Sequence, residues 1–291
     1  MQKHICLPLL LCALTGFASA QPLPKSIKPW INDEKIRDSI DDAIEHDELA
    51  IEIGKILEDA PQTCTLKIPS KRYASATNLY QSCSPSIVII SRSGYCKRCD
   101  KIHGRASGTG FFVSDNGAIA TNYHLVDHDD GTYFVTTFDG KTYPVTKLLA
   151  ANKRDDLAIL QIEPKEPTAF TPLPLVNQAP VGMPVWVISH PDHRFFTMTD
   201  GIISRYREME PKKRNNFIRH SMMITAPFSP GSSGGPVLDK NGNVVGIARA
   251  REAVGRSKHA EHEHPDIPAQ IAHLCIPVEQ LVRMIKRDQS Y

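Results

Sequence analysis

Three residues of the types that together make a serine reactive lie far apart in this 291-residue chain. His124 directly follows a strand-like run, Asp156 directly precedes another, and Ser233 lies within the glycine-rich segment Gly231–Gly235. A serine hydroxyl is a weak nucleophile until a base takes its proton, and that base must be oriented by a third group. The order histidine, aspartate, serine, on a chain of strands and hairpins, is one known arrangement of such a triad. These three residues are therefore the candidate catalytic set.

The segment around the serine also fits a second enzyme class. Gly231 to Gly235 match G-x-S-x-G, the nucleophile elbow of the α/β-hydrolases. That elbow places its serine before a helix, whereas Pro236 and the turn Asn241-Gly242 predict a hairpin here. Its acid and histidine follow the serine, and Asp266 and His273 do lie downstream, but no strand–turn–helix pattern supports them. We therefore reject the elbow.

Taken singly, the three segments have simpler interpretations. The glycine-rich segment could be a tight turn, His124 a surface or structural residue, and the aspartate a turn residue, for which Asp155 competes with Asp156. Their occurrence together, in this order, favours a catalytic set over three coincidences.

Short strand-like runs separated by turns make up most of the chain after Cys83. Such spacing is typical of β-barrels or sandwiches rather than of alternating β and α units. The runs lie at 86–91, 110–114, 118–122, 133–138, 157–162 and 185–189, with a further hairpin over 238–244. After Pro277, apolar residues spaced at helical intervals, from Val278 to Ile285, predict a C-terminal helix.

The N-terminal part differs from the rest in composition. Residues 1–20 combine Lys3, an apolar run and Ala18-Ser19-Ala20, the plan of a secretory signal peptide. Residues 21–29 read as an extended tether, and apolar periodicity over 32–59 predicts a helix of roughly seven turns. This extension could be a pro-segment, an oligomer arm or a structural brace. A net charge of +2 gives no reason to expect nucleic acid as a partner.

Five segments, in order, resemble one protein family. They are GTGFFVSDNGAIATNYHLV, DDLAILQI, TDGIIS, PGSSGGPVLDKNGNVVGIA and LCIPVEQLV. From about residue 84 to 282 the chain resembles the trypsin-like serine peptidases, most closely the bacterial HtrA/Deg-type protease domain. The resemblance implies an all-β fold of two six-stranded β-barrels, here with an N-terminal helical extension and a C-terminal helix. It also implies a serine endopeptidase that acts on polypeptides and needs no cofactor.

The resemblance assigns roles to the candidate residues. Ser233 would attack the scissile carbonyl, His124 would act as general base and then acid, and Asp156 would orient the imidazole. Backbone N–H groups at Gly231, Ser232 and Ser233 would form the oxyanion hole.

The chain also departs from the family. We expect no PDZ domain, because the chain stops at Tyr291 after one helix. Ser232 stands where digestive enzymes have an aspartate that pairs with a newly freed N-terminus, so activation by that ion pair is not expected. Ser189-His190-Pro191 replaces the usual G-N-P turn.

The specificity pocket is predicted from three positions. Pro227 stands where a trypsin carries the aspartate that binds Arg or Lys, and Ala248 where a glutamyl endopeptidase would carry a histidine. Phe228 and Ala248 as walls suggest small or medium apolar side chains before the cleaved bond.

Five cysteines follow the predicted signal peptide, and an exported chain tolerates disulfides. We expect a Cys64–Cys83 disulfide and take Cys275 as a core residue. Cys96 and Cys99 with His103 offer two thiolates and an imidazole, and histidines gather at 259–264. Zinc usually takes four ligands, so a disulfide or reactive thiols are favoured over a metal site, and no metal is expected.

These observations predict a signal peptide at 1–20, a tether and helical extension at 21–82, and a protease domain at 83–291 whose barrels divide near 175–180. The protein is expected to be exported, periplasmic or secreted, with no membrane span, and oligomers are possible through the N-terminal helix. The rival hypothesis is a latent or inactive protein that keeps the fold for binding or a chaperone-like role.

Overall fold

The computed structural model describes residues 31–46, 50–72, 78–128, 131–208, 220–254 and 270–288. The predicted signal peptide, the tether, Asp266 and the histidines at 259–264 lie outside these ranges. Within them no helix is long and apolar enough to cross a membrane.

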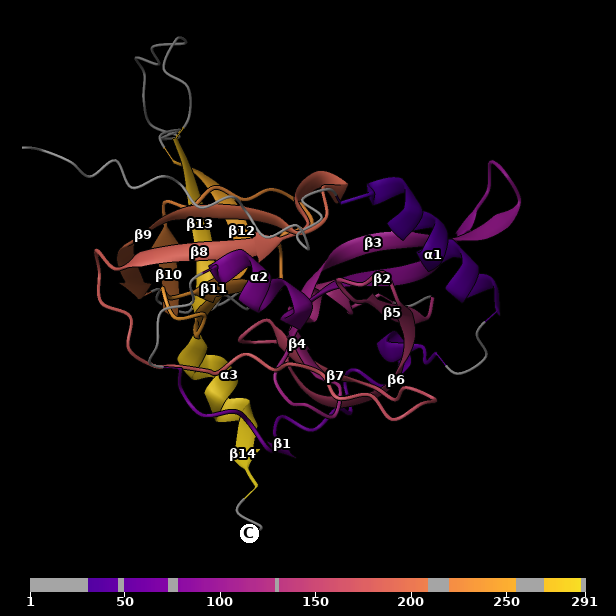
Figure 1. The fold of residues 1–291 in the computed structure, drawn as a ribbon, viewed down its shortest axis with the longest axis horizontal. Helices are drawn as coiled ribbons and strands as arrows, with labels where there is room; N and C mark the ends of the chain where they lie inside the picture. Colours follow the sequence, from indigo (N-terminus) through magenta and orange to yellow (C-terminus); the bar gives the residue numbers. More distant parts are fainter. Residues whose placement is uncertain are drawn as a thin grey trace, which may run out of the picture. The chain divides into compact units, whose positions relative to one another are not determined.

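Two closed six-stranded β-barrels form the body of the protein, as the sequence predicted (Figure 1). The first barrel runs in the order β2-β3-β4-β7-β6-β5 and the second in the order β10-β13-β12-β11-β8-β9. The strands of the first are β2 (Ile87–Cys96), β3 (Lys101–Phe112), β4 (Ala118–Thr121), β5 (Tyr133–Thr136), β6 (Thr142–Asn152) and β7 (Leu157–Ile162). Those of the second are β8 (Pro184–Ser189), β9 (Thr197–Glu208), β10 (His220–Ile224), β11 (Pro236–Leu238), β12 (Val244–Val254) and β13 (Gln270–Pro277).

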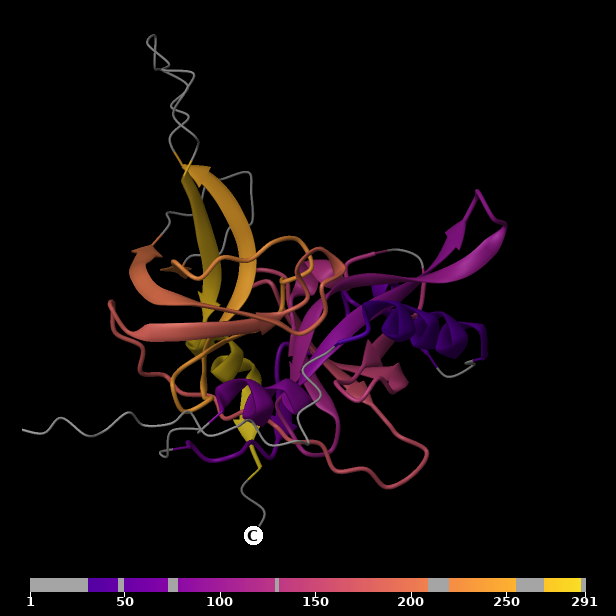
Figure 2. The ribbon, with the colours of Figure 1, turned by 45° about the horizontal axis from the view of Figure 1, so that its top comes forward.

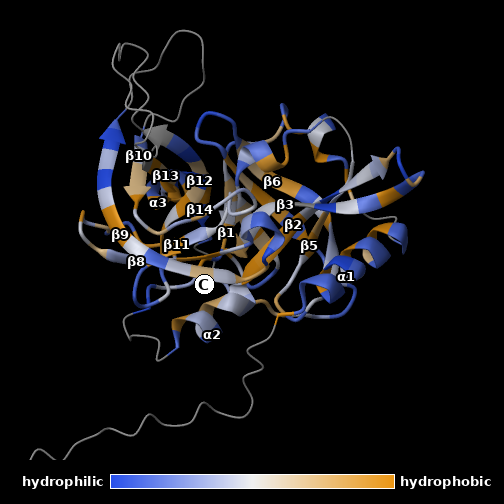
Figure 3. Cartoon of the chain, turned by 90° about the horizontal axis from the view of Figure 1, so that it is seen from above, coloured by the Kyte–Doolittle hydropathy of each residue, from blue (hydrophilic) through white to orange (hydrophobic). Residues whose placement is uncertain are grey.

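Each barrel is filled by its own apolar core, and closure leaves no unpaired barrel edge. Figure 3 shows apolar residues concentrated along the barrel strands. Short 3-10 helices, η2 (Ser84–Ser86), η3 (Tyr123–Leu125) and η4 (Pro191–His193), lie at strand ends. The helix α2 (Leu79–Cys83) precedes η2.

The N-terminal helix α1 (Asp33–His46) packs on the first barrel, against β3, β5 and β6. Its start is capped, since the Asn32 side chain accepts a hydrogen bond from the Lys35 N–H at 2.9 Å. Ile36, Ile40 and Ile44 are buried, and each such side chain contributes about 1.5–3 kcal/mol. The close approach needs a glycine in β3, because a Cβ on Gly104 would lie 2.3 Å from Ile40 Cγ2.

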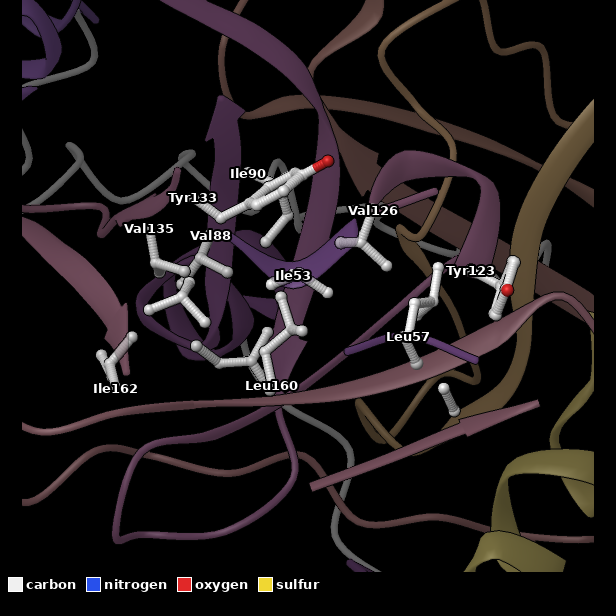
Figure 4. Packing of buried hydrophobic residues seen from close by; sticks show 14 of the residues in the cluster. Ile53, Leu57, Val88, Ile90, Tyr123, Val126, Tyr133, Val135, Leu160 and Ile162 are labelled. Carbon is white, nitrogen blue, oxygen red and sulfur yellow. The ribbon is translucent and has the colours of Figure 1, made fainter. Parts of the chain in front are cut away.

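The predicted seven-turn helix over 32–59 is wrong in its second half. The helix α1 ends at His46, and Ile53 to Lys55 form the short 3-10 helix η1 instead. Ile53 and Leu57 insert into the core of the first barrel, where Ile53 is fully buried (Figure 4). Gly54 disfavours a helix there, and filling the barrel core outweighs helical periodicity.

The C-terminal helix is shorter than predicted. The helix α3 (Val278–Met284) gives way at Ile285 to β14 (Ile285–Arg287), which pairs in parallel with β1 (Cys64–Leu66). Ile285 therefore lies in a strand opposite Cys64 rather than on the helix.

The expected Cys64–Cys83 disulfide is not formed, and all five cysteines after residue 20 are free thiols. Cys64 pairs with Ile285 of β14. Cys83 lies at the end of α2, where its sulfur is so close to Gly242 that a Cβ on that glycine would collide with it. The two residues thus belong to different contacts. Cys275 is buried within the core of the second barrel, as expected.

Candidate active site

The first barrel supplies a histidine and a carboxylate that bind each other directly. His124 lies in η3, immediately after β4, and Asp156 lies immediately before β7. The His124 Nδ1 atom is 2.9 Å from Asp156 Oδ2, and the His124 backbone N–H donates to Asp156 Oδ1 at 2.9 Å. A carboxylate only accepts hydrogen bonds, so Nδ1 carries the proton and Nε2 is left as the acceptor. This is the tautomer that a general base requires.

The backbone at Asp156 is strained and is held in place by hydrogen bonds. Its φ of 55° lies in the left-handed region, which costs a non-glycine residue about 1–3 kcal/mol. Its carbonyl accepts hydrogen bonds from the Tyr123 N–H at 3.1 Å and from the Asn122 side chain at 3.0 Å. These bonds join the residue before β7 to the turn that carries His124. Asp155 instead bonds the Asn152 side chain, so of the two neighbouring aspartates it is Asp156 that contacts His124.

Asp156 is nearly buried, with its side chain 8% exposed. Burial by itself would raise the pKa of this carboxyl, but hydrogen bonds and charge from His124, with a hydrogen bond from Arg249, outweigh it and lower the pKa. The carboxylate is therefore ionised at neutral pH. A buried carboxylate with several donors is a rigid acceptor for an imidazole.

The second barrel contributes Ser233. It lies in the loop that joins β10 to β11, on the turn just before β11 begins. Gly231 and Gly234 on either side have φ values of 93° and 85°, which L side chains rarely adopt. A Cβ on Gly234 would lie 2.0 Å from the Thr109 carbonyl oxygen, so the turn packs directly on β3. The strand β11 follows this turn, and no helix does, which excludes the nucleophile elbow.

Thr109 of β3 joins the two barrels at the site. Its N–H donates to the Ser233 carbonyl at 2.8 Å, and its hydroxyl donates to the Gly231 carbonyl at 2.8 Å. On the same strand, a Cβ on Gly108 would meet both Leu125, next to His124, and the Ser233 carbonyl. The serine turn and the histidine turn therefore pack against one strand.

The peptide unit between Pro230 and Gly231 is oriented by a hydrogen bond. The Pro230 carbonyl accepts it from the N–H of Asp192, in η4, at 2.7 Å. Because carbonyl and N–H point in opposite directions across a trans peptide, the Gly231 N–H is directed away from that loop. Ser232 is buried, and its hydroxyl accepts a hydrogen bond from Ser189 at 3.0 Å. Ser232 thus replaces the family's aspartate with a neutral contact.

The loop that carries η4 is packed tightly around His190. Its Nδ1 accepts a hydrogen bond from the Phe196 N–H at 3.0 Å, and the rings of Phe195 and Phe196 meet it edge-on. Burial lowers the pKa of His190 to about 3, so the ring is neutral at physiological pH. The helix α1 also touches this loop, since Asp33 accepts a hydrogen bond from the Phe195 N–H at 3.1 Å.

Sequence reasoning missed Arg249, which contacts both halves of the site. Its Nε donates to Asp156 Oδ2 at 2.8 Å, and its carbonyl accepts a hydrogen bond from Ser233 Oγ at 2.9 Å. In this structure the serine hydroxyl therefore points to Arg249 rather than to His124. A charged residue within the apolar strand run VVGIARA was the signal that could have indicated it.

The predicted pocket residues are placed in two environments. Phe228 and Ala248 belong to the apolar core of the second barrel, and Phe228 packs edge-on to His273 with ring centroids 4.7 Å apart. Pro227 is exposed. Their role in choosing the residue before the cleaved bond stays a prediction.

Known proteins resemble this chain over the same region. A trypsin-like peptidase domain matches residues 108–247, which include all three candidate residues. The "Probable periplasmic serine endoprotease DegP-like" of Bartonella henselae is 34% identical over 155 residues, covering 53% of this chain and 30% of that protein. The protein of the same name from Brucella suis is 35% identical over 147 residues, covering 50% of this chain and 28% of that protein.

A plant protein, "Protease Do-like 1, chloroplastic" of Arabidopsis thaliana, is 30% identical over 182 residues, covering 60% of this chain and 41% of that protein. The chain thus matches less than half the length of each of these three relatives.

Proposed function

Because this chain carries a trypsin-like peptidase domain of the HtrA type, we propose that it is a serine endopeptidase whose nucleophile is Ser233. The single observation that best supports this is the Asp156–His124 pair, in which Nδ1 faces the carboxylate and Nε2 is left to accept a proton. The triad roles, the oxyanion hole and the substrate class are part of this proposal.

The proposed reaction begins with rotation of the Ser233 side chain. Its hydroxyl leaves the Arg249 carbonyl and donates to His124 Nε2. Catalytic hydrogen bonds of this kind often form only when the substrate is bound. His124 takes the proton as Ser233 Oγ attacks the peptide carbonyl, and Asp156 stabilises the imidazolium without being protonated. The N–H groups of Gly231 and Ser233 would stabilise the oxyanion. His124 then protonates the leaving amine, and water hydrolyses the acyl-enzyme by the same path in reverse.

Export to the periplasm or beyond is part of the proposal. Two relatives are named periplasmic endoproteases, and residues 1–20 have the pattern of a signal peptide. Polypeptides, with a small or medium apolar residue before the cleaved bond, are the proposed substrates.

A labelling experiment tests the nucleophile. A fluorophosphonate probe should label the purified protein at Ser233, and Ser233→Ala or His124→Ala should abolish labelling. Ser204→Ala, which removes a hydroxyl on the exposed part of β9, is the matched control and should label as the wild type does. Turnover of a casein substrate should fall by about 10⁴–10⁶-fold in Ser233→Ala. Labelling at a different residue would contradict the assignment.

One observation favours a second candidate, a latent protein that binds polypeptides without cleaving them. Ser233 Oγ is bonded to the Arg249 carbonyl, and the Arg249 side chain occupies one acceptor position on Asp156. If this arrangement persists with substrate bound, the serine is never activated. Absence of labelling in well-folded wild-type protein, with retained binding of an unfolded polypeptide, would select this function.

A further inference from the structure

A second cluster of reactive side chains lies outside the proposed active site, at the tip of the hairpin of β2 and β3. The ligand atoms of Cys96, Cys99 and His103 all lie within 4.8 Å of one another. Cys99 Sγ is 2.9 Å from His103 Nε2. Both cysteines are free thiols, and Cys99 is exposed. Figures 1 and 2 show this hairpin extending past the first barrel beside α1.

The strand register explains why these residues meet. Cys96 is paired with Lys101, and Gly94 is paired with His103. Directly opposed residues share a face of a β-ribbon, as do residues two apart on one strand, so Cys96 and His103 lie on the same face. The turn between them is closed by a 2.9 Å hydrogen bond from the Asp100 N–H to the Cys96 carbonyl. Asp100 has a φ of 58°, which bends the chain and returns Cys99 towards the ribbon.

The imidazole of His103 has a different partner on each side. Its Nε2 faces the two sulfur atoms, while its Nδ1 is 3.8 Å from Asp41 Oδ2 on α1. The other oxygen of Asp41 accepts a hydrogen bond from the Gly104 N–H at 2.7 Å, so the carboxylate is fixed. Metal-bound histidines commonly donate their second ring N–H to a carboxylate, and a small closing movement of Asp41 would complete that contact here.

We propose that Cys96, Cys99 and His103 bind one Zn²⁺ ion through two sulfur atoms and one imidazole nitrogen, with a fourth position open to water. Zinc commonly takes sulfur and nitrogen ligands in a tetrahedral arrangement. Mg²⁺ and Ca²⁺ take oxygen ligands, which this cluster does not offer. A CxxC segment that served only as a disulfide would need neither His103 at the sulfurs nor Asp41 behind it. On binding, any thiol proton is released to solvent.

The site would connect the hairpin to the N-terminal helix. Asp41 lies on α1, so a metal that fixes His103 also fixes the Asp41 contact, and with it the packing of α1 on β3. The site is separate from Ser233, His124 and Asp156 and does not depend on the proposed catalysis.

Zinc binding can be measured directly on the purified protein. After reduction and removal of metal, the protein should take up one equivalent of Zn²⁺ in competition with a chromogenic chelator, and zinc should raise its melting temperature. Co²⁺ in place of zinc should give a thiolate-to-cobalt charge-transfer band in the near ultraviolet and d–d bands of tetrahedral intensity. Cys96→Ser and Cys99→Ser should each abolish the band and the uptake.

Matched variants separate ligation from general effects. Cys64→Ser removes a half-buried thiol elsewhere and should bind zinc as the wild type does. Asp41→Asn should weaken zinc binding by about 10–100-fold while the cobalt band persists. Lack of zinc uptake by the fully reduced protein would overturn the proposal, whether or not a Cys96–Cys99 disulfide is found in the native protein. Equal loss of uptake in Cys64→Ser would also overturn it.

Discussion

The triad candidates and the hairpin-tip cluster are two groups of polar side chains in very different surroundings. Asp156 is 8% exposed and accepts hydrogen bonds from the His124 backbone, the His124 ring and Arg249, at 2.8–2.9 Å. At the hairpin tip, Asp41 and His103 are 47% and 39% exposed, and their atoms are 3.8 Å apart. Asp156 is therefore buried and closely bonded to His124, whereas the Asp41–His103 pair is exposed and farther apart.

The difference shows that burial sets how much free energy is lost when a charged side chain lacks hydrogen-bond donors. A buried charge must be matched by donors, because an unmatched one costs several kcal/mol. Water can satisfy an exposed group equally well, so an exposed pair contributes about 0–1 kcal/mol. The protein therefore orders the Asp156–His124 pair through its own donors, whereas the proposed zinc ion would order the hairpin tip. The following substitutions test the buried group in this comparison.

The largest effect is expected from Asp156→Asn. An amide cannot serve as the anionic acceptor for Nδ1, so His124 would adopt the wrong tautomer, and kcat should fall by about 10⁴-fold, as in the chymotrypsin template. Steady-state hydrolysis of a peptide substrate measures this. Asp155→Asn is the control, because Asp155 bonds only Asn152, and it should keep nearly full activity. A loss below tenfold in Asp156→Asn would refute the proposed role of Asp156.

A smaller effect is expected from Arg249→Ala. The substitution removes a hydrogen bond to a buried carboxylate. A hydrogen bond to a charged group contributes about 1.5–3 kcal/mol, and loss of that much transition-state stabilisation would lower kcat roughly 10–100-fold. KM should stay unchanged if Arg249 only positions Asp156, and Arg249→Lys should restore part of the rate. Increased activity in Arg249→Ala would instead support the latent protein, in which Arg249 holds the site inactive.

The last expected effect is on stability rather than on rate, and it concerns His190. Its pKa of about 3 in the folded protein lies below the ordinary 6.5, so the unfolded chain binds more protons between these values. Stability conferred by the neutral ring is present above pH 6.5 and is lost as pH falls towards 3, by about 1.4 kcal/mol per pH unit.

The variant His190→Asn lacks this proton uptake and provides the comparison. Its free energy of unfolding should fall less steeply than that of the wild type between pH 6 and pH 4, as measured by urea denaturation. Other titrating groups are common to both proteins and cancel in the difference. Parallel pH dependences would show that His190 is not protonated on unfolding in this range.

The all-β character could be predicted because local signals were strong, whereas the two six-stranded barrels were implied by the resemblance to a known family. The apolar run at 157–162 became β7, and the turn Asn241-Gly242 joins β11 to β12, since strand and turn preferences act over a few residues. The candidate triad was likewise visible, because each member lies at a strand end within a characteristic segment. The second half of the predicted N-terminal helix failed because Ile53 and Leu57 fill a barrel core built from residues far along the chain.

By itself, the sequence determined the all-β character and indicated His124, Ser233 and one of two neighbouring aspartates as the candidate triad. Its resemblance to a known family implied the two barrels. Only the tertiary structure decided that Arg249 bonds Asp156, that Cys64 and Cys83 stay apart, and that Asp41 of α1 stands behind His103. The physical reason is how far apart in the sequence the interacting residues lie. Strand and turn preferences are set by neighbours in the chain, whereas these contacts join residues brought together only when closed barrels and a docked helix fix their positions.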